Sequence, residues 1–350
     1  MGNTQVNVRL LLLLAVCVII CSILCVLGGS YFINFIHYLI SRYDGKYYID
    51  IAKNGYSNAT FGFLPLFPLV IKASASVTGE YELTTLTINL LLLITSNYVF
   101  YKLLFLYKIN NRKLTAFIFL PVQPVLVVYT FACMAEPLFV LLVLISFYYF
   151  KKDKILFASI FGLMATMTKT VGVLLFPIYF LVLVLPSCPV HNLSGVFIQL
   201  LRNIKSMAKK ITCLLLIPMG LLIVFGYYYL ISGDFLIYLR AQNGWEQGLT
   251  FPFFGFFNEI VYLHLYFEFG WIAMLGVYLY ILWYLFKKRY TDLAIYMAVF
   301  ISFYSCLKCV YDFHRFLSVL FPFPLGVGIL LSKLRQIRIE KNLSRGRWFK

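Results

Sequence analysis

An acidic turn in the N-terminal third of the chain is the first candidate for chemistry. Asp44 and Gly45 separate two stretches whose apolar residues recur at helical spacing, and Asn54-Gly55 ends the second stretch. We interpret both stretches as amphipathic helices in a membrane interface, which places Asp44 at the membrane surface. A carboxylate that acts on a lipid headgroup needs this position. The alternative role of Asp44 is the N-cap of a helix over 45–53, and the two roles are compatible.

Further polar side chains lie at the predicted ends of apolar segments and in a second loop. The candidates for a site among them are Glu136, Lys169, Arg240, Gln242, Trp245, His314 and Arg315, and Arg42 precedes the acidic turn. Ionisable groups near a bilayer are costly, so they either form mutual pairs or serve a function. A purely structural pair, Glu136 with Lys169 or Asp312 with Arg315, is the alternative to a functional role.

The composition identifies the elements that must position these side chains. Apolar residues make up 62% of the 350 residues and charged residues 12%, which excludes a soluble globular domain and a disordered chain. Several apolar runs are long enough to cross a bilayer as a helix. We predict an all-α polytopic membrane protein that forms one domain over 1–350, with about ten transmembrane helices. Their ranges are 10–27, 84–106, 114–131, 137–150, 155–169, 171–186, 211–231, 267–286, 292–307 and 316–332.

The distribution of charge predicts the topology. With the N-terminus inside, most of the 30 Lys and Arg residues fall in inner loops and in a basic tail over 333–350, and most acidic residues fall outside. The net charge of +17 therefore indicates contact with anionic membrane lipids and not with nucleic acid. The outer side then holds a loop over 28–83, which contains Asp44, and a second loop over 232–266. A cleaved signal peptide is the alternative for the first span and leaves the remaining topology unchanged.

Six short motifs follow one another along nearly the whole chain. They are Arg42-Tyr43-Asp44-Gly45-Lys46-Tyr47-Tyr48 with Ile51-Ala52 and Gly55-Tyr56, Phe61-Gly62-Phe63-Leu64-Pro65-Leu66-Phe67-Pro68-Leu69, Ala135-Glu136-Pro137-Leu138-Phe139, Thr168-Lys169-Thr170-Val171-Gly172, Gly233-Asp234 with Arg240-Ala241-Gln242 and Trp245, and His314-Arg315-Phe316 with Pro322. In this order they resemble the motifs of the PIG-V family of mannosyltransferases. The departures from the family pattern are Tyr43 for a Trp, Leu64 for an aromatic residue, Lys169 for an Arg, and Asp50, which has no counterpart.

The resemblance implies a GT-C class enzyme, similar to the second mannosyltransferase of glycosylphosphatidylinositol (GPI) anchor biosynthesis and closer in length to its prokaryotic relatives. It implies the inverting transfer of a mannosyl or related hexosyl group from a polyprenyl- or dolichyl-phosphate sugar to a lipid-linked or glycan acceptor. The active site would lie on the outer or luminal face, and Asp44 matches the family's catalytic base. The membrane is the plasma membrane for a prokaryotic chain and the endoplasmic reticulum membrane for a eukaryotic one.

The phosphate that leaves in such a transfer needs positive side chains. Candidates for contact with the donor phosphate or the acceptor are Arg42, Glu136, Lys169, Arg240, Gln242, Trp245, His314 and Arg315. We expect no cofactor and no metal, since the chain has neither an Asp-x-Asp motif nor a glycine-rich phosphate loop. The alternative function is a flippase or transporter for lipid-linked sugars, in which polar groups cluster near the bilayer midplane within paired repeats.

Overall fold

The protein is built from α-helices. A computed structural model of the chain describes residues 29–185, 199, 202–243, 248–255, 265–308 and 313–346. Within these residues every regular element is a helix, apart from an isolated bridge between Leu249 and Leu307. The predicted all-α class is therefore confirmed. The predicted span over 10–27 and much of the predicted inner loop over 187–210 lie outside the described residues.

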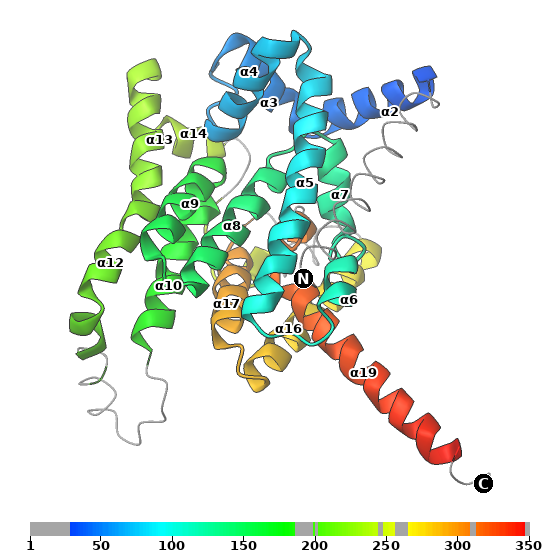
Figure 1. Cartoon of the computed structure of the whole chain (residues 1–350). Coiled ribbons are helices and arrows are strands. Elements are labelled where there is room, and N and C mark those ends of the chain that lie inside the picture. Colours follow the sequence, from blue (N-terminus) through cyan, green and yellow to red (C-terminus); the bar gives the residue numbers. More distant parts are fainter. Residues whose placement is uncertain are drawn as a thin grey trace.

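Three helices form the predicted loop over 28–83 at the upper end of the molecule (Figure 1). They are α2 (Gly29–Arg42), α3 (Gly45–Asn54) and α4 (Leu66–Thr78). The predicted break at Asp44 and Gly45 is confirmed, and Gly55 ends α3 with a φ of 84° that favours glycine. The sequence analysis did not predict α4, although it buries Phe67 and Ile71 completely. On α2, Ile36 and Ile40 are buried, while a second apolar side remains exposed.

A nearly buried helix, α8 (Glu136–Lys151), forms the centre of the bundle. It packs against α5 (Tyr81–Leu106) on one side and α9 (Ile155–Thr168) on the other, and α9 packs in turn against α13 (Leu216–Ser232). Most side chains of α8 are buried, because apolar residues cover its whole circumference. The helix leads from Glu136 at its N-terminus to Lys151 at its last turn. At 1.5 Å per residue these two ends lie roughly 22 Å apart.

Three predicted spans are each made of two helical elements in the structure. The predicted span over 114–131 is instead two short helices, α6 (Arg112–Phe117) and α7 (Pro124–Phe131). Proline lacks the N–H that a continuous helix would need, and Pro124 instead occupies the favoured first position of α7. Two further predicted spans each comprise two helical elements that follow one another without a break. The range 171–186 contains a 3-10 turn, η1 (Thr170–Leu174), and α10 (Leu175–Val184), and the range 211–231 contains the end of α12 (Ala208–Leu214) and most of α13.

The C-terminal third completes the bundle. Its helices are α14 (Ile237–Asn243), α16 (Leu265–Lys287), α17 (Thr291–Ser305), α18 (Phe313–Leu317) and α19 (Pro322–Gly346). The predicted last span over 316–332 starts later than expected, since the helix begins at Pro322, where proline suits a first turn. It also continues into the predicted basic tail, so that α19 extends away from the bundle toward the C-terminus (Figure 1).

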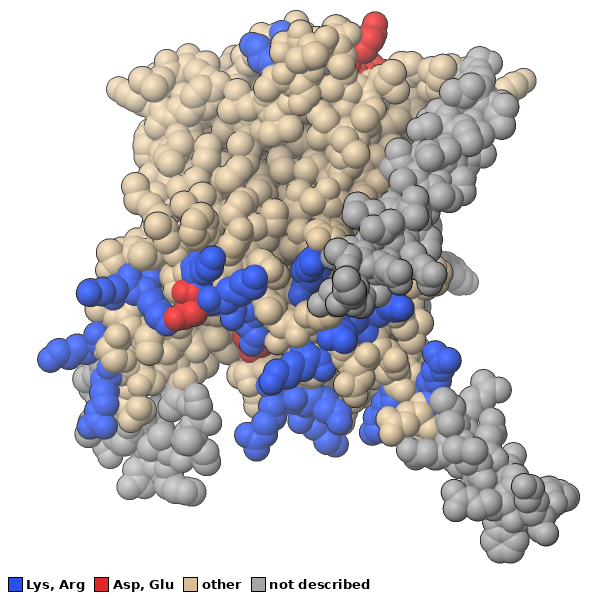
Figure 2. Space-filling view, viewed as in Figure 1, with Lys and Arg blue, Asp and Glu red and all other residues tan. Residues whose placement is uncertain are grey.

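Two of the described helices are long and apolar enough to cross a membrane. They are α5 and the continuous stretch Ala208–Ser232, which comprises α12 and α13. Other apolar helices, such as α9 and α17, are shorter than 18 residues. On the face shown in Figure 2, Lys and Arg gather at the lower end, and a broad band above them carries no charged side chain. This separation of an uncharged band from a basic end is typical of proteins that lie in a bilayer.

Candidate functional site

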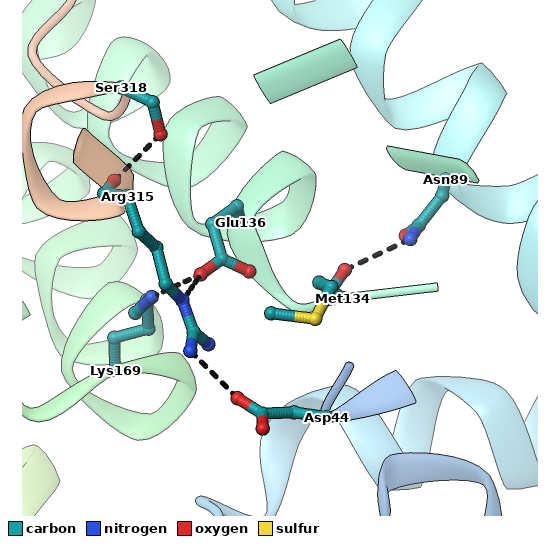
Figure 3. A network of polar contacts seen from close by, with 7 residues as sticks. All are labelled: Asp44, Asn89, Met134, Glu136, Lys169, Arg315 and Ser318. Carbon is teal, nitrogen blue, oxygen red and sulfur yellow. Dashed lines mark hydrogen bonds and ion pairs between the residues drawn. The ribbon is translucent and has the colours of Figure 1, made fainter. Parts of the chain in front are cut away.

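Four of the predicted site residues meet in one cluster (Figure 3). They are Asp44 in the turn between α2 and α3, Glu136 at the start of α8, Lys169 between α9 and η1, and Arg315 in α18. Each comes from a different part of the chain, and several long helices separate them along the sequence. The cluster is therefore a product of the tertiary fold. We call these four residues the charged cluster.

Glu136 holds both cations of the charged cluster through one oxygen. Lys169 Nζ lies 2.6 Å and Arg315 Nε 2.5 Å from Glu136 Oε1. The Glu136 side chain is completely buried, and its other oxygen, Oε2, is buried with no hydrogen-bond partner among the described residues. A carboxylate without solvent must be compensated by charge, and the two cations supply that compensation. The predicted pair of Glu136 with Lys169 is thus present, and Arg315 joins it.

Arg315 extends the network from Glu136 to Asp44. Its second nitrogen, Nη1, lies 2.7 Å from Asp44 Oδ2. The side chain of Asp44 keeps 22% of its surface exposed, against 13% for Arg315 and none for Glu136. Two carboxylates and two cations make the cluster neutral as a whole. Of the two carboxylates, Asp44 is the one that a ligand can reach.

Local backbone structure explains why Asp44 points to Arg315. Asp44 occupies the N-cap position of α3, but its side chain makes no capping hydrogen bond. The predicted cap is therefore confirmed in position and not in its side-chain contact. The next residue, Gly45, packs so closely that a Cβ atom there would collide with the carbonyl oxygen of Ala132. Gly45 thus fixes the turn against the segment before α8, and only glycine fits there.

Two further features position Lys169 and Glu136 in the charged cluster. The helix α9 ends at Thr168, and Lys169 adopts an extended conformation that turns its side chain away from the helix axis. On the other side, buried Asn89 of α5 donates from Nδ2 to the carbonyl oxygen of Met134, 2.9 Å away. This contact anchors the chain two residues before Glu136 (Figure 3). The sequence analysis missed Asn89, although an Asn within an apolar helix is a signal for such an anchor.

A cavity of about 310 Å³ adjoins the charged cluster and is lined by Asp44, Lys169 and Arg315. Aromatic rings form much of the remaining wall, from Tyr48, Phe63, Tyr238, Tyr304 and Phe316. Burial raises the pKa of Tyr48 well above its usual value, and the nearby Glu136 carboxylate raises it further. Tyr48 therefore stays a neutral phenol. A mostly apolar cavity with aromatic walls and a few polar groups can bind a ligand that has both apolar faces and hydroxyl groups.

The other predicted site residues lie at different distances from this cavity. Gln242 lines it and donates from Nε2 to the Gly62 carbonyl oxygen at 3.0 Å. Arg240 is 70% exposed, forms an ion pair with Asp234 and is not in the cluster. Arg42, at the end of α2, is exposed and does not line the cavity. Trp245 and the side chain of His314 lie outside the part of the chain that the structure describes.

Comparisons of the chain with protein-family models, with curated proteins and with solved structures found no match. The chemistry of the site is therefore inferred from its own geometry. An accessible carboxylate can accept a proton from a bound hydroxyl group. Two adjacent cations can stabilise negative charge that develops on a leaving group in the same cavity. Among the described residues no group of three or more His, Cys, Asp or Glu side chains is arranged to hold a metal ion.

Proposed function

We propose that the chain is a membrane glycosyltransferase of the PIG-V type. It would transfer a mannosyl or related hexosyl group from a polyprenyl- or dolichyl-phosphate sugar to a lipid-linked or glycan acceptor. The observation that carries the proposal is the convergence of Asp44, Lys169 and Arg315 on one cavity. All three belong to motifs that resemble those of the family, and they are the residues that this chemistry needs.

The proposed reaction uses the members of the charged cluster in separate roles. Asp44 takes the proton of the acceptor hydroxyl as its oxygen attacks the anomeric carbon of the sugar. The bond from that carbon to the phosphate oxygen breaks on the opposite face, which inverts the configuration. The lipid phosphate leaves with one additional negative charge, and Lys169 and Arg315 stabilise it. Positioned base catalysis contributes about 10²–10⁴-fold to such a rate.

The ion pair between Arg315 and Asp44 suggests why the base becomes active only with donor bound. In the structure, Arg315 bridges the carboxylates of Asp44 and Glu136. A donor phosphate in the cavity would compete for Arg315 and draw it away from Asp44. The Asp44 carboxylate would then be released to accept the proton of the acceptor. Glu136 would keep both cations in place, because its buried carboxylate has no solvent to replace them.

The proposed topology has about ten transmembrane helices, both termini inside and the charged cluster near the outer surface. Its support is the position of Glu136 and Lys151 at opposite ends of α8, with basic residues around the Lys151 end. A reporter fused after Phe150 should read as inside, and one fused after Gly79 as outside. An outside signal at Phe150 would contradict the orientation.

The donor assay tests the proposed function. Purified full-length protein in detergent would receive either polyprenyl-phosphate-mannose or GDP-mannose, with a panel of lipid acceptors and EDTA present. We expect mannosylated product from the lipid-linked donor only, since the cavity offers two cations for one phosphate and no metal cluster is evident in the described residues. Activity from GDP-mannose alone, or movement of the lipid donor across vesicles without product, would refute the proposal and favour another transferase or a transporter.

A further inference from the structure

A second polar region lies at the basic end of the molecule, far from the charged cluster. Two adjoining cavities of about 730 and 600 Å³ lie beside the turn between α5 and α6; the first also borders α16 and α19, and the second borders α8 and α19. They share Asn110, Asn111 and Arg335 as lining residues. We call the two cavities together the basic cleft. Its elements meet at the lower end in Figure 1, where Figure 2 shows the concentration of Lys and Arg.

The charges that line the basic cleft have one sign. The first cavity is lined by Lys108, Lys288, Lys333 and Arg335. The second is lined by Lys102, Arg112, Lys113, Lys152 and the shared Arg335. No carboxylate lines either cavity, and none of these cations forms a salt bridge with another described residue. Eight uncompensated cations around one cleft repel one another, so a bound anion would lower the electrostatic free energy of the cleft.

Other cations at the same end show that this absence of partners is selective. Lys151 pairs with Asp292 at 2.8 Å, and Lys210 pairs with Asp153. The fold therefore neutralises lysines immediately outside the basic cleft. Inside the cleft, Lys152 lies over the ring of Tyr148, and Arg112 lies over the ring of Phe105. Such contacts orient a cation and leave its charge available to a ligand.

A buried hydroxyl group supplies an independent indication of a ligand. Tyr284 of α16 is 5% exposed and lines the first cavity. Its hydroxyl group is buried and has no hydrogen-bond partner among the described residues. A buried hydroxyl costs free energy unless another polar group pairs with it. A phosphate oxygen can accept this hydrogen bond.

We infer that the basic cleft binds the phosphate headgroup of an anionic phospholipid. Phosphate is the chemistry that several cations and one hydroxyl donor recognise together. Apolar side chains favour a lipid over free phosphate, because Ile329, Phe105 and Leu114 line the same cavities and offer a surface for acyl chains. Figure 2 shows Lys and Arg just below the uncharged band, which is the level of lipid headgroups along a bilayer. The inference does not depend on the proposed transferase activity.

Lipid titration of the purified full-length chain tests this inference. Delipidated protein in detergent would be titrated with phosphatidylglycerol, with phosphatidylcholine and with soluble pyrophosphate, and bound lipid would be counted by native mass spectrometry. We expect phosphatidylglycerol to bind and the other two ligands not to compete with it. Equal binding of phosphatidylcholine would overturn the inference. Competition by pyrophosphate at the same phosphate concentration would replace the lipid with a free phosphate ligand.

Two variants locate the lipid in the basic cleft. Arg335→Gln removes the cation that both cavities share, and its affinity for phosphatidylglycerol should fall about fivefold. Lys209→Gln is the matched control, because Lys209 is exposed at the same end and lines neither cavity.

Tyr284→Phe should leave the delipidated protein at least as stable as the wild type, since it removes an unpaired hydroxyl, and should weaken lipid binding. Wild-type lipid affinity in both Arg335→Gln and Tyr284→Phe would contradict the inference.

Discussion

Two buried carboxylates at opposite ends of the bundle form salt bridges with lysine, but only one of them has a hydrogen-bond partner for each of its two oxygens. Asp292, near the basic end, accepts from Lys151 Nζ at 2.8 Å, from the Tyr107 hydroxyl at 2.6 Å and from its neighbour's backbone N–H at 3.0 Å. Both of its oxygens therefore have partners. Glu136 uses one oxygen for two cations, and its other oxygen has no partner among the described residues.

We interpret the contrast as one between a structural pair and a pair that serves the proposed site. Asp292 lines none of the cavities described above, and its contacts join α5, α8 and α17. Glu136 does not line the cavity of the charged cluster, but it forms ion pairs with Lys169 and Arg315, which do line that cavity. A carboxylate with all its partners in the protein stabilises the fold. A carboxylate that holds two cations at a cavity wall keeps positive charge ready for a ligand.

Among substitutions of the residues around Glu136, those of Arg315 should reduce transfer the most. Arg315→Ala removes the cation that joins both carboxylates, and transfer should fall by about 10²–10³-fold, the cost of losing one such electrostatic contact. Arg315→Lys should retain part of the activity, because the charge survives without the two-pronged contact. Steady-state assays of both variants with the lipid-linked donor measure the difference. Equal activity of Arg315→Ala and wild type would remove Arg315 from the mechanism.

Glu136→Gln and Asp292→Asn compare the two carboxylates directly. Glu136→Gln leaves two buried cations with one carboxylate, which should lower the free energy of unfolding by about 3–5 kcal/mol. Asp292→Asn should cost about 1–2 kcal/mol, since Lys151 is 33% exposed and water replaces part of its partner. Only Glu136→Gln should also reduce transfer in the protein that remains folded. Thermal unfolding in detergent, paired with activity per folded molecule, checks both statements. A selective loss of transfer in Asp292→Asn would contradict the distinction.

Of these substitutions, Tyr107→Phe should change stability and transfer the least. It removes one hydrogen bond to Asp292, whose salt bridge with Lys151 remains, so the free energy of unfolding should fall by about 0.5–1 kcal/mol, less than in Asp292→Asn. Transfer should stay at the wild-type level, because Tyr107 lies at the other end of α8 from the cavity. Unfolding curves and donor assays on the same preparation provide the comparison. A tenfold loss of transfer would show that the two ends of α8 are coupled.

The sequence predicted the members of the charged cluster better than it predicted their arrangement. Asp44, Glu136, Lys169 and Arg315 were identifiable because ionisable residues at the ends of apolar segments need partners or a function. Which of them would pair depends on how the helices pack, and no local pattern carries that information. Arg240 illustrates the limit, since it has the same residue type and lies in a matching motif but pairs with nearby Asp234.

The fold, too, was predictable from the sequence only in part. Hydrophobic runs located α5, α8, α9, α16 and α17 within a few residues, because length and apolarity are properties of the local sequence. They failed where proline interrupts a run, at Pro124 and at Pro322, since hydropathy alone ignores the missing N–H group. The close approach of Gly45 to Ala132 was also unpredictable, because it depends on a distant segment of the chain.

The turnover of Asp44→Asn is the most direct test of Asp44 as the catalytic base. Asn keeps the size of the side chain and suits an N-cap position, but it cannot take a proton from the acceptor. Asp50→Asn is the matched control, because Asp50 is an exposed carboxylate of α3 that accepts a hydrogen bond from Asn54 and does not line the cavity. We predict that Asp44→Asn lowers transfer from polyprenyl-phosphate-mannose by about 10²-fold or more while Asp50→Asn stays near wild type. Near wild-type turnover of folded Asp44→Asn would contradict the proposed mechanism.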